Sequence, residues 1–457
     1  MFDLKTTFPG RVSIIGAARS GLAAAEFFNN KGTSVFISDT CQADKLEKIL
    51  SDKGLAHLSH ESGAHSGKVL DCDVIILSPG VPSDLEILKK ARLNGIPVWS
   101  EMELGYRASK AKFLAVTGST GKSTTVSLLG EALNFGGKEA VVAGNIGVPV
   151  ISIVPSMSEN SFVVAEVSSF QLETIDQFRP IGAAVLNFMK NHLDRYNSED
   201  DYYNAKKEIA RNFTKENILV LNANDTRLCA WAHQMNDKTQ IIFFGANRRG
   251  FDCFWVEDNL IRYRLRGNEG SVLNVKEMFL QGPHNHENAC VASALAMIAG
   301  AEIEGIARGI CSFKGLKHRL EYVDEVNGIR YFNDSKSTTA ESILVAVKAF
   351  PCGVHLIAGG RDKFCDFSVV NEAIKEHVKD ITLIGEAAER MQSQWEGLVS
   401  IKRTSTLESA IDEAVSNAAK GDVVVFSPGC SSFDMFKNYE ERGEVFKRIV
   451  RERVISK

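Results

Sequence analysis

The amino-acid sequence predicts an α/β protein of three domains, each built on a mostly parallel sheet that is covered by helices. Three observations support this fold class. The chain has 457 residues, which exceeds what a single hydrophobic core usually holds. Strand-like runs alternate with helix-like segments along the whole chain. Most of these runs are apolar nearly throughout, as in strands that are buried on both faces of a parallel sheet.

The composition is ordinary for a globular protein, with 44% hydrophobic and 24% charged residues. The net charge of -4 argues against non-specific nucleic-acid binding, which favours a basic chain. No apolar run approaches the roughly 20 residues of a membrane span, and Met1–Lys5 lack the basic and then apolar pattern of a secretory signal. The nine cysteines are scattered along the chain and include no Cys-x-x-Cys pair. Such a distribution is typical of a protein whose thiols are reduced. We therefore expect a cytoplasmic protein.

The N-terminal segment predicts a small sheet with its own ligand-binding turn, and we place this domain at residues 1–107. Strand-like runs lie at residues 11–16, 34–39 and 73–80, and one helical segment lies at residues 20–32. The turn after the first run reads Gly16-Ala17-Ala18-Arg19-Ser20-Gly21, and Asp39 follows roughly 20 residues later, which is a variant of the dinucleotide-binding fingerprint. Considered alone, this pattern supports an NAD-linked oxidoreductase.

The middle of the chain predicts a larger sheet, and we place this domain at residues 108–314. Its strand-like runs lie at residues 112–118, 140–145, 162–169, 182–188, 218–225 and 241–245. Residues 251–267 indicate a smaller β insertion, and residues 286–300 predict a strongly apolar helix that closes the domain.

A third set of strands predicts a C-terminal domain at residues 315–457. Four apolar strands run directly into polar turns that carry Gly or Ser, at residues 329–338, 354–363, 381–387 and 423–432. Ligands of open α/β sheets bind beyond the carboxyl ends of the strands. We therefore expect these turns to form a ligand-binding surface.

The segment "AVTGSTGKSTT" (115–125) predicts a phosphate-binding loop between a strand and a helix. Gly118 and Gly121 lack a Cβ, so the backbone N–H groups can curve around phosphate oxygens at a helix N-terminus. Lys122 supplies a positive charge, and the Ser123 hydroxyl can ligate Mg²⁺. Val116 stands where the full motif has its first glycine. We expect ATP contacts from the whole loop: Thr117, Gly118, Ser119, Thr120, Gly121, Lys122 and Ser123.

A site for Mg²⁺ and ATP also needs a carboxylate near the loop. Glu166 ends a buried apolar run, where a carboxylate is costly unless it coordinates a metal ion or pairs with a lysine or arginine. The sequence leaves these two alternatives open. His192 follows another apolar run. An isolated histidine is more often structural than a ligand, but this position beside the nucleotide site favours a metal ligand.

Eight motifs follow one another along nearly the whole chain. They are "TGSTGKST" (117–124), "GNIG" (144–147), "EVSSFQLE" (166–173), "NHLDRY" (191–196), "YYNAKKEI" (202–209), "HRLEYV" (318–323), "NDSKST" (333–338) and "SPGCSSFDMFKNYEERG" (427–443). In this order they resemble the Mur ligase family, ATP-dependent enzymes that form amide bonds in peptidoglycan precursor synthesis. "SSFQLE", "NDSKST" and the last motif are most similar to the member that adds D-glutamate to UDP-N-acetylmuramoyl-L-alanine.

The resemblance implies a Rossmann-like UDP-sugar domain, a central P-loop-type ATPase domain and a Rossmann-like C-terminal domain that binds the amino acid. It implies that UDP-N-acetylmuramoyl-L-alanine, D-glutamate and ATP react through an acyl phosphate to give the amide, ADP and phosphate. No protein nucleophile is needed, since the enzyme brings anionic reactants together and screens their repulsion with metal ions and cations. A monomer is expected.

The resemblance also implies the roles of individual residues. Lys122, Glu166, His192 and Lys206 are the implied catalytic residues, and Ser123, Glu166, His192 and Lys206 serve the metal sites, which hold two Mg²⁺ ions. Lys206 matches the lysine that CO₂ carbamylates in the family. Its neighbour Lys207 is the alternative, but the spacing to Tyr202 and Ile209 favours Lys206.

The resemblance to the family also implies which residues contact the ligands. Further ATP contacts are implied for Asn288, Arg319 and Asp334. UDP contacts are implied for Ser20, Asp39 and Thr40, and muramoyl contacts for Asn145 and Ser168. D-glutamate contacts are implied for Thr338, Lys363, Ser432 and Tyr439. On sequence alone, Lys363 could equally be a solvated loop lysine.

The sequence departs from the family pattern at three places. Tyr439 stands where a phenylalanine is often found, Asn191 where an acid is often found, and Ala18 alters the N-terminal turn. Three other functions remain possible. Another Mur-type or folylpolyglutamate-type amide ligase would differ in its amino-acid pocket. An NAD-linked oxidoreductase would leave "NDSKST" and the last motif unexplained. A nucleotide-binding switch would give no reason for a first domain with its own ligand-binding turn.

Overall fold

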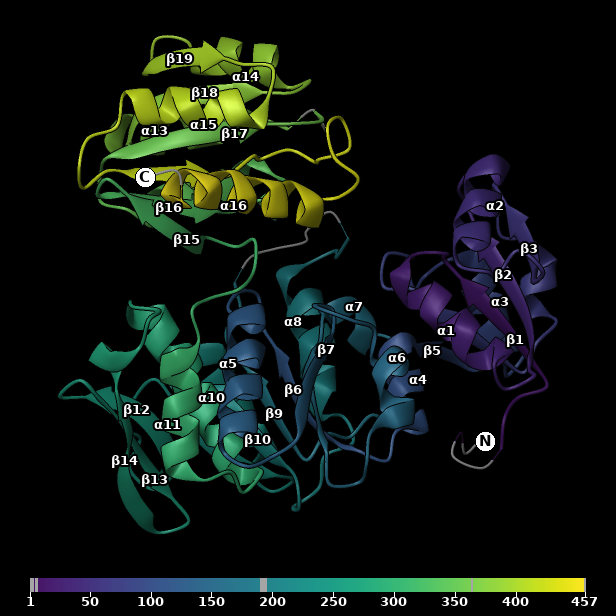
Figure 1. Cartoon of the computed structure of the whole chain (residues 1–457). Coiled ribbons are helices and arrows are strands. Elements are labelled where there is room, and N and C mark those ends of the chain that lie inside the picture. The colour runs from purple at the N-terminus through teal and green to yellow at the C-terminus, as the bar shows by residue number, and fades with distance from the viewer. Residues whose placement is uncertain (1–3, 5–6, 190–194, 363–364, 456–457) are drawn as a thin grey trace. The chain divides into compact units, whose positions relative to one another are not determined.

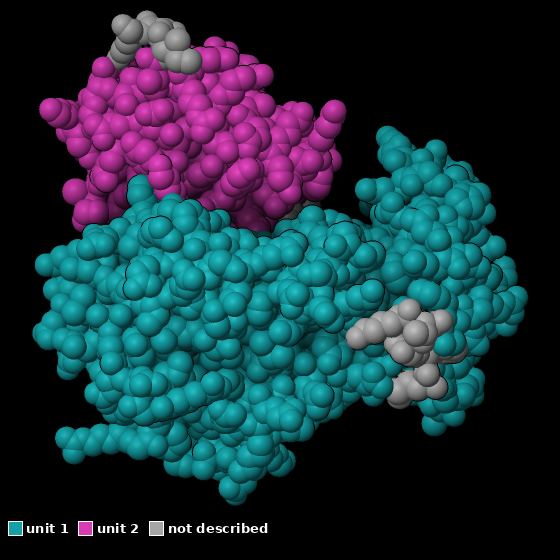
Figure 2. Space-filling view, turned by 60° about the horizontal axis from the view of Figure 1, so that its bottom comes forward, with its two compact units in different colours: residues 1–313 teal, residues 314–457 magenta. Residues whose placement is uncertain are grey.

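Three separate sheets carry the strands of the described residues, and each is flanked by helices (Figure 1). The computed structural model describes residue 4 and residues 7–189, 195–362 and 365–455. The chain forms two compact units, Met1–Phe313 with the first two sheets and Lys314–Lys457 with the third (Figure 2). The expected α/β class with three mostly parallel, helix-covered sheets is confirmed.

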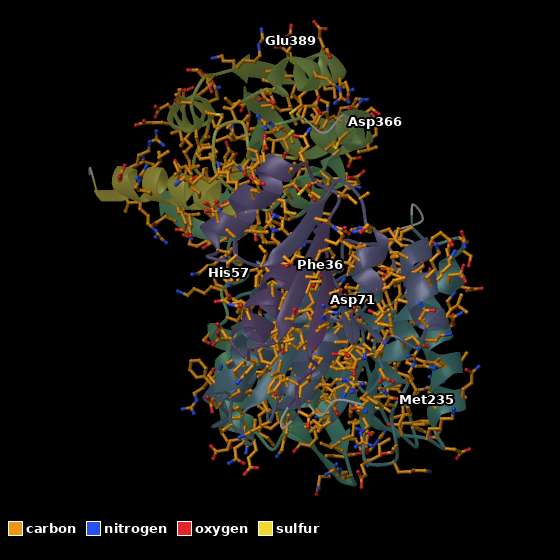
Figure 3. The ribbon with its side chains drawn as sticks, turned by 90° about the vertical axis from the view of Figure 1, so that its right-hand side faces the viewer. Phe36, His57, Asp71, Met235, Asp366 and Glu389 are labelled. Atoms are coloured by element: carbon orange, nitrogen blue, oxygen red, sulfur yellow. The ribbon has the colours of Figure 1, made fainter. Side chains whose placement is uncertain are left out.

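The first sheet is fully parallel, in the order β3-β2-β1-β4-β5. Its strands are β1 (Arg11–Ile15), β2 (Ser34–Asp39), β3 (Ser59–Ser62), β4 (Val74–Leu77) and β5 (Val98–Ser100). Its helices are α1 (Arg19–Asn29), α2 (Ala43–Asp52), η1 (Gly67–Leu70), α3 (Glu86–Leu93) and α4 (Glu101–Ala108). Ile14 belongs to one core cluster and its neighbour Ile15 to another, so both faces of β1 are buried. Figure 3 labels the half-buried Phe36 on β2.

The second sheet has the order β14-β13-β12-β11-β10-β9-β6-β8-β7. Its strands are β6 (Lys112–Thr117), β7 (Ala140–Gly144), β8 (Phe162–Glu166), β9 (Gly182–Val185), β10 (Ile218–Asn222), β11 (Gln240–Phe244), β12 (Asp252–Glu257), β13 (Leu260–Leu265) and β14 (Asn268–Asn274). Strands β6 to β12 pair in parallel, whereas β12, β13 and β14 pair antiparallel. The β insertion expected at residues 251–267 is present as β12 and β13, which with β14 extend the edge of the central sheet.

Helices cover both faces of this second sheet. They are α5 (Lys122–Phe135), α6 (Val150–Ile153), η2 (Val154–Ser156), α7 (Ser169–Leu172), α8 (Glu199–Lys207), η3 (Glu208–Ala210), α9 (Thr226–Met235), η4 (Val275–Glu277), α10 (Pro283–Ile298) and α11 (Ile303–Ser312). The helix expected at residues 286–300 is α10, but α11 follows it and packs beside α5. Gly305 and Gly309 allow this close approach, because a Cβ on either would lie about 2.5 Å from the backbone of α5 or its C-terminal cap.

The third sheet has the order β15-β16-β20-β17-β18-β19. Its strands are β15 (Glu321–Val326), β16 (Ile329–Asn333), β17 (Val354–Gly359), β18 (Val378–Ile384), β19 (Ser400–Arg403) and β20 (Val423–Phe426). Its helices are α12 (Ala340–Lys348), η5 (Phe367–Val370), α13 (Asn371–His377), α14 (Ala388–Trp395), α15 (Leu407–Ser416) and α16 (Tyr439–Ile455). The β15–β16 pair is antiparallel and the rest of the sheet is parallel.

Among the described residues, no helix combines the length and the apolar character that a membrane crossing requires. All nine cysteines lie within the described residues and are free thiols.

Candidate active site

The segment between β6 and α5 forms the tight turn that the sequence predicts. Gly118 and Gly121 adopt φ angles of +148° and +82°, and Gly121 caps the N-terminus of α5. A Cβ on Gly121 would lie 2.8 Å from Oδ1 of Asn288, and one on Gly118 would lie 3.0 Å from the side chain of Leu186. Both glycines are therefore required by conformation and by space.

The polar groups of this loop face inward. The Lys122 ammonium donates to the carbonyl oxygens of Gly118 and Ser119, at 2.9 and 3.1 Å. The backbone N–H groups of Ser119 and Thr120 both donate to Oδ1 of Asn187, at 3.0 Å each. Two loop N–H groups thus converge on one oxygen acceptor, which is the arrangement that binds an anion. The sequence pattern did not single out Asn187, although it lies next to the end of the apolar run 182–188.

Glu166 lies at the end of β8, directly beside the start of α5. The Ser123 hydroxyl donates to its Oε2 at 2.7 Å, and the Asn145 amide donates to its Oε1 at 2.9 Å. The carboxylate is buried, with 3% of the residue exposed. Within the described part of the chain it has no lysine or arginine at ion-pair distance, and both hydrogen-bond donors are neutral. Of the two alternatives left by the sequence, this arrangement favours a metal ligand over an ion pair.

Lys206, at the end of α8, reaches the same loop. Its ammonium donates to the carbonyl oxygen of Gly118 at 3.0 Å and lies 4.3 Å from the centre of the Tyr202 ring. Burial, with the nearby charge of Lys122, lowers the pKa of Lys206 to about 7, although Glu166 acts in the opposite direction. Lys207 is only partly buried and donates to Asn204 instead. Of the two neighbouring lysines, Lys206 is the one at the phosphate loop.

Asn288 on α10 completes this part of the site. Its Oδ1 accepts a hydrogen bond from the Thr125 hydroxyl at 3.1 Å, and the side chain lies against Gly121. Ser168 caps α7 in a capping box with Gln171, so its hydroxyl is engaged within the chain. His192 and Lys363 lie outside the described residues, and the expectations for them stay predictions.

The segment after β1 forms the tight turn that the sequence predicts for the first sheet. Gly16 has a φ of +95°, and a Cβ there would lie 2.8 Å from Ser78. The Asp39 carboxylate accepts hydrogen bonds from the backbone N–H groups of Ala17 and Cys41, at 2.6 and 2.8 Å. Burial opposes its charge, but these hydrogen bonds outweigh burial and lower the pKa of Asp39. Ser20 is half-buried on α1 and Thr40 is exposed.

In the second unit, Arg319 is exposed on a strained turn. Its neighbours His318 and Leu320 have φ angles of +62° and +42°. The Leu320 N–H donates to the carboxylate of Asp334 at 3.1 Å, and Ser427 donates to the same carboxylate at 2.8 Å. Burial raises the pKa of Asp334 to about 7. The structure therefore gives Asp334 a part in holding the turn that presents Arg319.

The residues expected around the amino acid lie on one unit but differ in exposure. Ser432 is buried, whereas Thr338 and Tyr439 are half-buried. Ser335 donates to the carbonyl oxygen of Tyr439 at 2.8 Å. Sequence reasoning missed Arg442, whose buried guanidinium donates to Ser335 and to the carbonyl oxygen of Cys430. Its place within the last motif was the available signal.

A phosphate-binding loop with a buried carboxylate beside it, on the middle one of three α/β sheets, defines a nucleotide-binding protein of the P-loop class. Three family models match successive parts of the chain: a MurD-like N-terminal domain of Mur ligases over residues 10–100, the Mur ligase middle domain over 116–296, and the Mur ligase glutamate ligase domain over 318–430. The chain belongs to the Mur ligase family.

Individual relatives match almost the full length. A UDP-N-acetylmuramoylalanine–D-glutamate ligase of Koribacter versatilis is 39% identical over 445 residues, which are 96% of this chain and 97% of that protein. A protein of the same name from Thermoanaerobacter pseudethanolicus is 36% identical over 447 residues, 97% of this chain and 98% of that protein.

Solved structures share the fold at lower sequence identity. MurC of Thermotoga maritima, a UDP-N-acetylmuramate–alanine ligase, has a TM-score of 0.57 and 18% identity, covering 98% of this chain and 100% of that chain. MurF of Acinetobacter baumannii has a TM-score of 0.58 and 21% identity, covering 82% and 85%.

Proposed function

We propose that this protein joins D-glutamate to UDP-N-acetylmuramoyl-L-alanine at the expense of ATP, in cytoplasmic peptidoglycan precursor synthesis, and that it acts as a monomer. The observation that carries the proposal is the cluster of Ser123, Glu166 and Lys206 at the phosphate loop, in a chain that is 36 to 39% identical to ligases of this name over nearly its whole length.

The chemistry requires activation of a poor electrophile. An oxygen of the alanine carboxylate attacks the γ-phosphorus of ATP, the bond to the β-phosphate oxygen breaks, and ADP leaves. The D-glutamate amine, having lost its ammonium proton, attacks the acyl phosphate carbon, and phosphate leaves with the oxygen that came from the acid. The net products are the amide, ADP and phosphate.

In this proposal the loop residues Thr117–Ser123 hold the ATP phosphates, since their N–H groups and Lys122 face inward. Asn288, Arg319 and Asp334 complete the ATP site, with Asp334 acting at least in part through the turn of Arg319. Ser20, Asp39 and Thr40 bind the UDP moiety, and Asn145 and Ser168 lie toward the muramoyl group. Thr338, Lys363, Ser432 and Tyr439 surround D-glutamate.

The residues present fit a divalent metal ion. Glu166 is a buried carboxylate whose hydrogen-bond partners are neutral, and Ser123 supplies a hydroxyl oxygen beside it. Ser123, Glu166, His192 and a carbamylated Lys206 would hold two Mg²⁺ ions, which when bound neutralise charge on the phosphates.

Carbamylation of Lys206 is supported by its surroundings. An amine reacts with CO₂ in its neutral form, and burial beside Lys122 favours that form. The product, a carbamate, replaces a buried cation by an anion at the end of α8, close to the loop. Lys206 in that form would act as an oxygen ligand of the second metal ion.

The test is phosphate release from ATP and Mg²⁺ with defined acceptors. We expect release only when UDP-N-acetylmuramoyl-L-alanine and D-glutamate are both present. Release with L-lysine or meso-diaminopimelate in place of D-glutamate would instead assign the protein to a sister activity. Release that is independent of the sugar nucleotide would contradict the proposal.

A further inference from the structure

Glu173, the last residue of the motif "EVSSFQLE", joins the first sheet to the second within one compact unit. The Ser83 hydroxyl donates to its Oε2 at 2.6 Å, and the Tyr196 hydroxyl donates to its Oε1 at 2.5 Å. Ser83 lies in the segment that follows β4 of the first sheet, whereas Glu173 follows α7 of the second. None of these residues belongs to the ligand sites proposed above.

Arg195 makes a second connection at the same place. Its guanidinium donates to the carbonyl oxygens of Pro79 and Val81 at 3.1 Å each, and lies 3.6 Å from the carboxylate of Glu173. It also lies 3.8 Å from the centre of the Phe170 ring. Only the planar, forked guanidinium can donate in two directions while stacking on a ring. The side chains of Arg195 and Glu173 are 19% and 16% exposed, so water competes only weakly.

On the side of the first sheet, the segment 78–83 contacts the glycine-rich turn. The Ser78 hydroxyl donates to the carbonyl oxygen of Gly16 at 2.8 Å. A Cβ on Gly16 would lie 2.8 Å from Ser78 and 2.9 Å from Val81. The carbonyl groups that Arg195 holds therefore belong to the segment that packs on the turn, and a shift of one requires a shift of the other.

On the side of the second sheet, a series of ring contacts leads to the phosphate loop. Phe170 stacks on Tyr196 with centroids 5.9 Å apart, and Tyr196 lies 5.4 Å from Tyr202. The Lys206 ammonium lies over the Tyr202 ring and donates to Gly118 of the loop. Arg195 and Glu173 thus stand between two ligand-binding turns, with packed contacts to each.

We infer that Arg195 and Glu173 are positioning residues that set the distance between these two turns, and thereby select a ligand that reaches both at once. The inference rests on the proposed function, in which the uridine diphosphate end of the substrate lies at the first turn and its carboxylate at the phosphate loop. A ligand that bridges two sites gains affinity and reactivity only when the spacing of the sites is held to match it. A ligand that occupies one turn gains nothing from that spacing.

The experiment compares Arg195→Gln and Glu173→Gln with the wild-type protein. We expect kcat/KM for UDP-N-acetylmuramoyl-L-alanine to fall roughly 10- to 100-fold, the usual effect of losing hydrogen bonds made by a charged group. The KM of the sugar nucleotide should rise while the KM of ATP stays unchanged. The dissociation constants of UDP alone and of ATP with Mg²⁺ alone should equal those of the wild-type protein.

The chain offers a matched control in Arg92. Its guanidinium also donates to a carbonyl oxygen of this segment, that of Ser83 at 2.9 Å, but from α3 of the same sheet. Arg92→Gln should leave every constant unchanged. Ser83→Ala is the variant to use if Arg195→Gln does not fold, because it removes only one hydroxyl. It should also raise the KM of the sugar nucleotide.

The outcomes separate the two claims. A wild-type protein that does not ligate D-glutamate overturns the proposed function, and this inference falls with it. An active wild-type protein whose Arg195 and Glu173 variants retain full kcat/KM overturns the inference alone. Equal losses for UDP alone and for the complete substrate would also overturn it, because they indicate damage to the first domain and not a change of spacing.

Discussion

The hydroxyl of Ser123 donates a hydrogen bond to the carboxylate of Glu166 across 2.7 Å, between the first turn of α5 and the end of β8. The other carboxylate oxygen accepts from the Asn145 amide, so among the described residues the side chains that donate to this buried carboxylate are neutral. Such a charge is stable when a cation joins it. In the proposed function, this pair holds a metal ion next to the phosphates of ATP.

Replacing Glu166 by Gln tests that link. The variant keeps the shape and one hydrogen-bond acceptor but loses the charge, so we expect kcat for phosphate release to fall by about 100-fold or more. The apparent Mg²⁺ requirement should also rise.

Glu139→Gln is the control for this substitution. Glu139 precedes β7 and accepts a hydrogen bond from Ser161, which precedes β8, so the pair lies at the end of these strands opposite to Glu166. It should keep normal activity. Wild-type activity of Glu166→Gln at the same Mg²⁺ concentration would contradict the metal assignment.

Replacing Lys206 by Ala should abolish turnover, because in the proposed function the side chain of Lys206 is carbamylated and serves as a metal ligand. Added short-chain carboxylic acids should restore part of the activity by occupying the vacated space. Lys207→Ala, which removes the more exposed neighbour, should remain active. Steady-state phosphate release measures all three. Full activity of Lys206→Ala without added acid would overturn the role.

Replacing Gly121 by Ala should abolish ATP binding. Its φ of +82° disfavours a side chain, and the new Cβ would lie 2.8 Å from Asn288. Gly137→Ala is the matched control, since Gly137 has a φ of +78° but open space around it. That variant should lose roughly 1 kcal/mol of stability and keep its ATP affinity. Titration calorimetry with ATP and Mg²⁺ distinguishes them, and equal affinities would contradict the steric argument.

Much of the architecture follows from local patterns, because short apolar runs such as Ile218–Asn222, bounded by polar turns, are typical of strands buried on both faces. The sequence also predicts the residues of the phosphate-binding loop, because they form one contiguous segment: Gly118, Gly121, Lys122 and Ser123. The sequence did not show which sheet residues 251–267 join, because antiparallel strands that extend a sheet have the same pattern as a separate hairpin.

Contacts between distant segments do not appear in any local pattern. The sequence could not show that Asn187 accepts from the loop N–H groups, that Arg442 is buried and donates to Ser335, or that Lys206 donates to Gly118. Each depends on which face of an element is covered once the sheet has formed.

The third sheet contains a buried charged cluster that predicts a pH dependence of stability. The fully buried His355 lies 2.9 Å from Asp380 and 3.2 Å from Asp422, and Lys379 also pairs with Asp422. Burial opposes a charge on the imidazole, but the hydrogen bonds to both aspartates outweigh burial and raise the pKa of His355 above its ordinary 6.5.

Because the folded state holds this proton more tightly, the added stability is fully present below the unfolded pKa of about 6.5 and is lost as the pH rises through the folded pKa. We expect the second unit of the wild-type protein to lose stability as the pH rises from about 6 to about 9, and His355→Gln to lose less. Thermal unfolding at the two pH values measures this. An identical pH dependence in the variant would contradict the assignment.

The measurement that tests the central claim uses UDP-N-acetylmuramoyl-L-alanine with ¹⁸O in the alanine carboxylate. After complete ligation to D-glutamate in the presence of ATP and Mg²⁺, mass spectrometry of the released phosphate should show one ¹⁸O atom for each amide formed from fully labelled acid. Unlabelled phosphate, with the amide formed, would contradict activation of the acid by the γ-phosphoryl group.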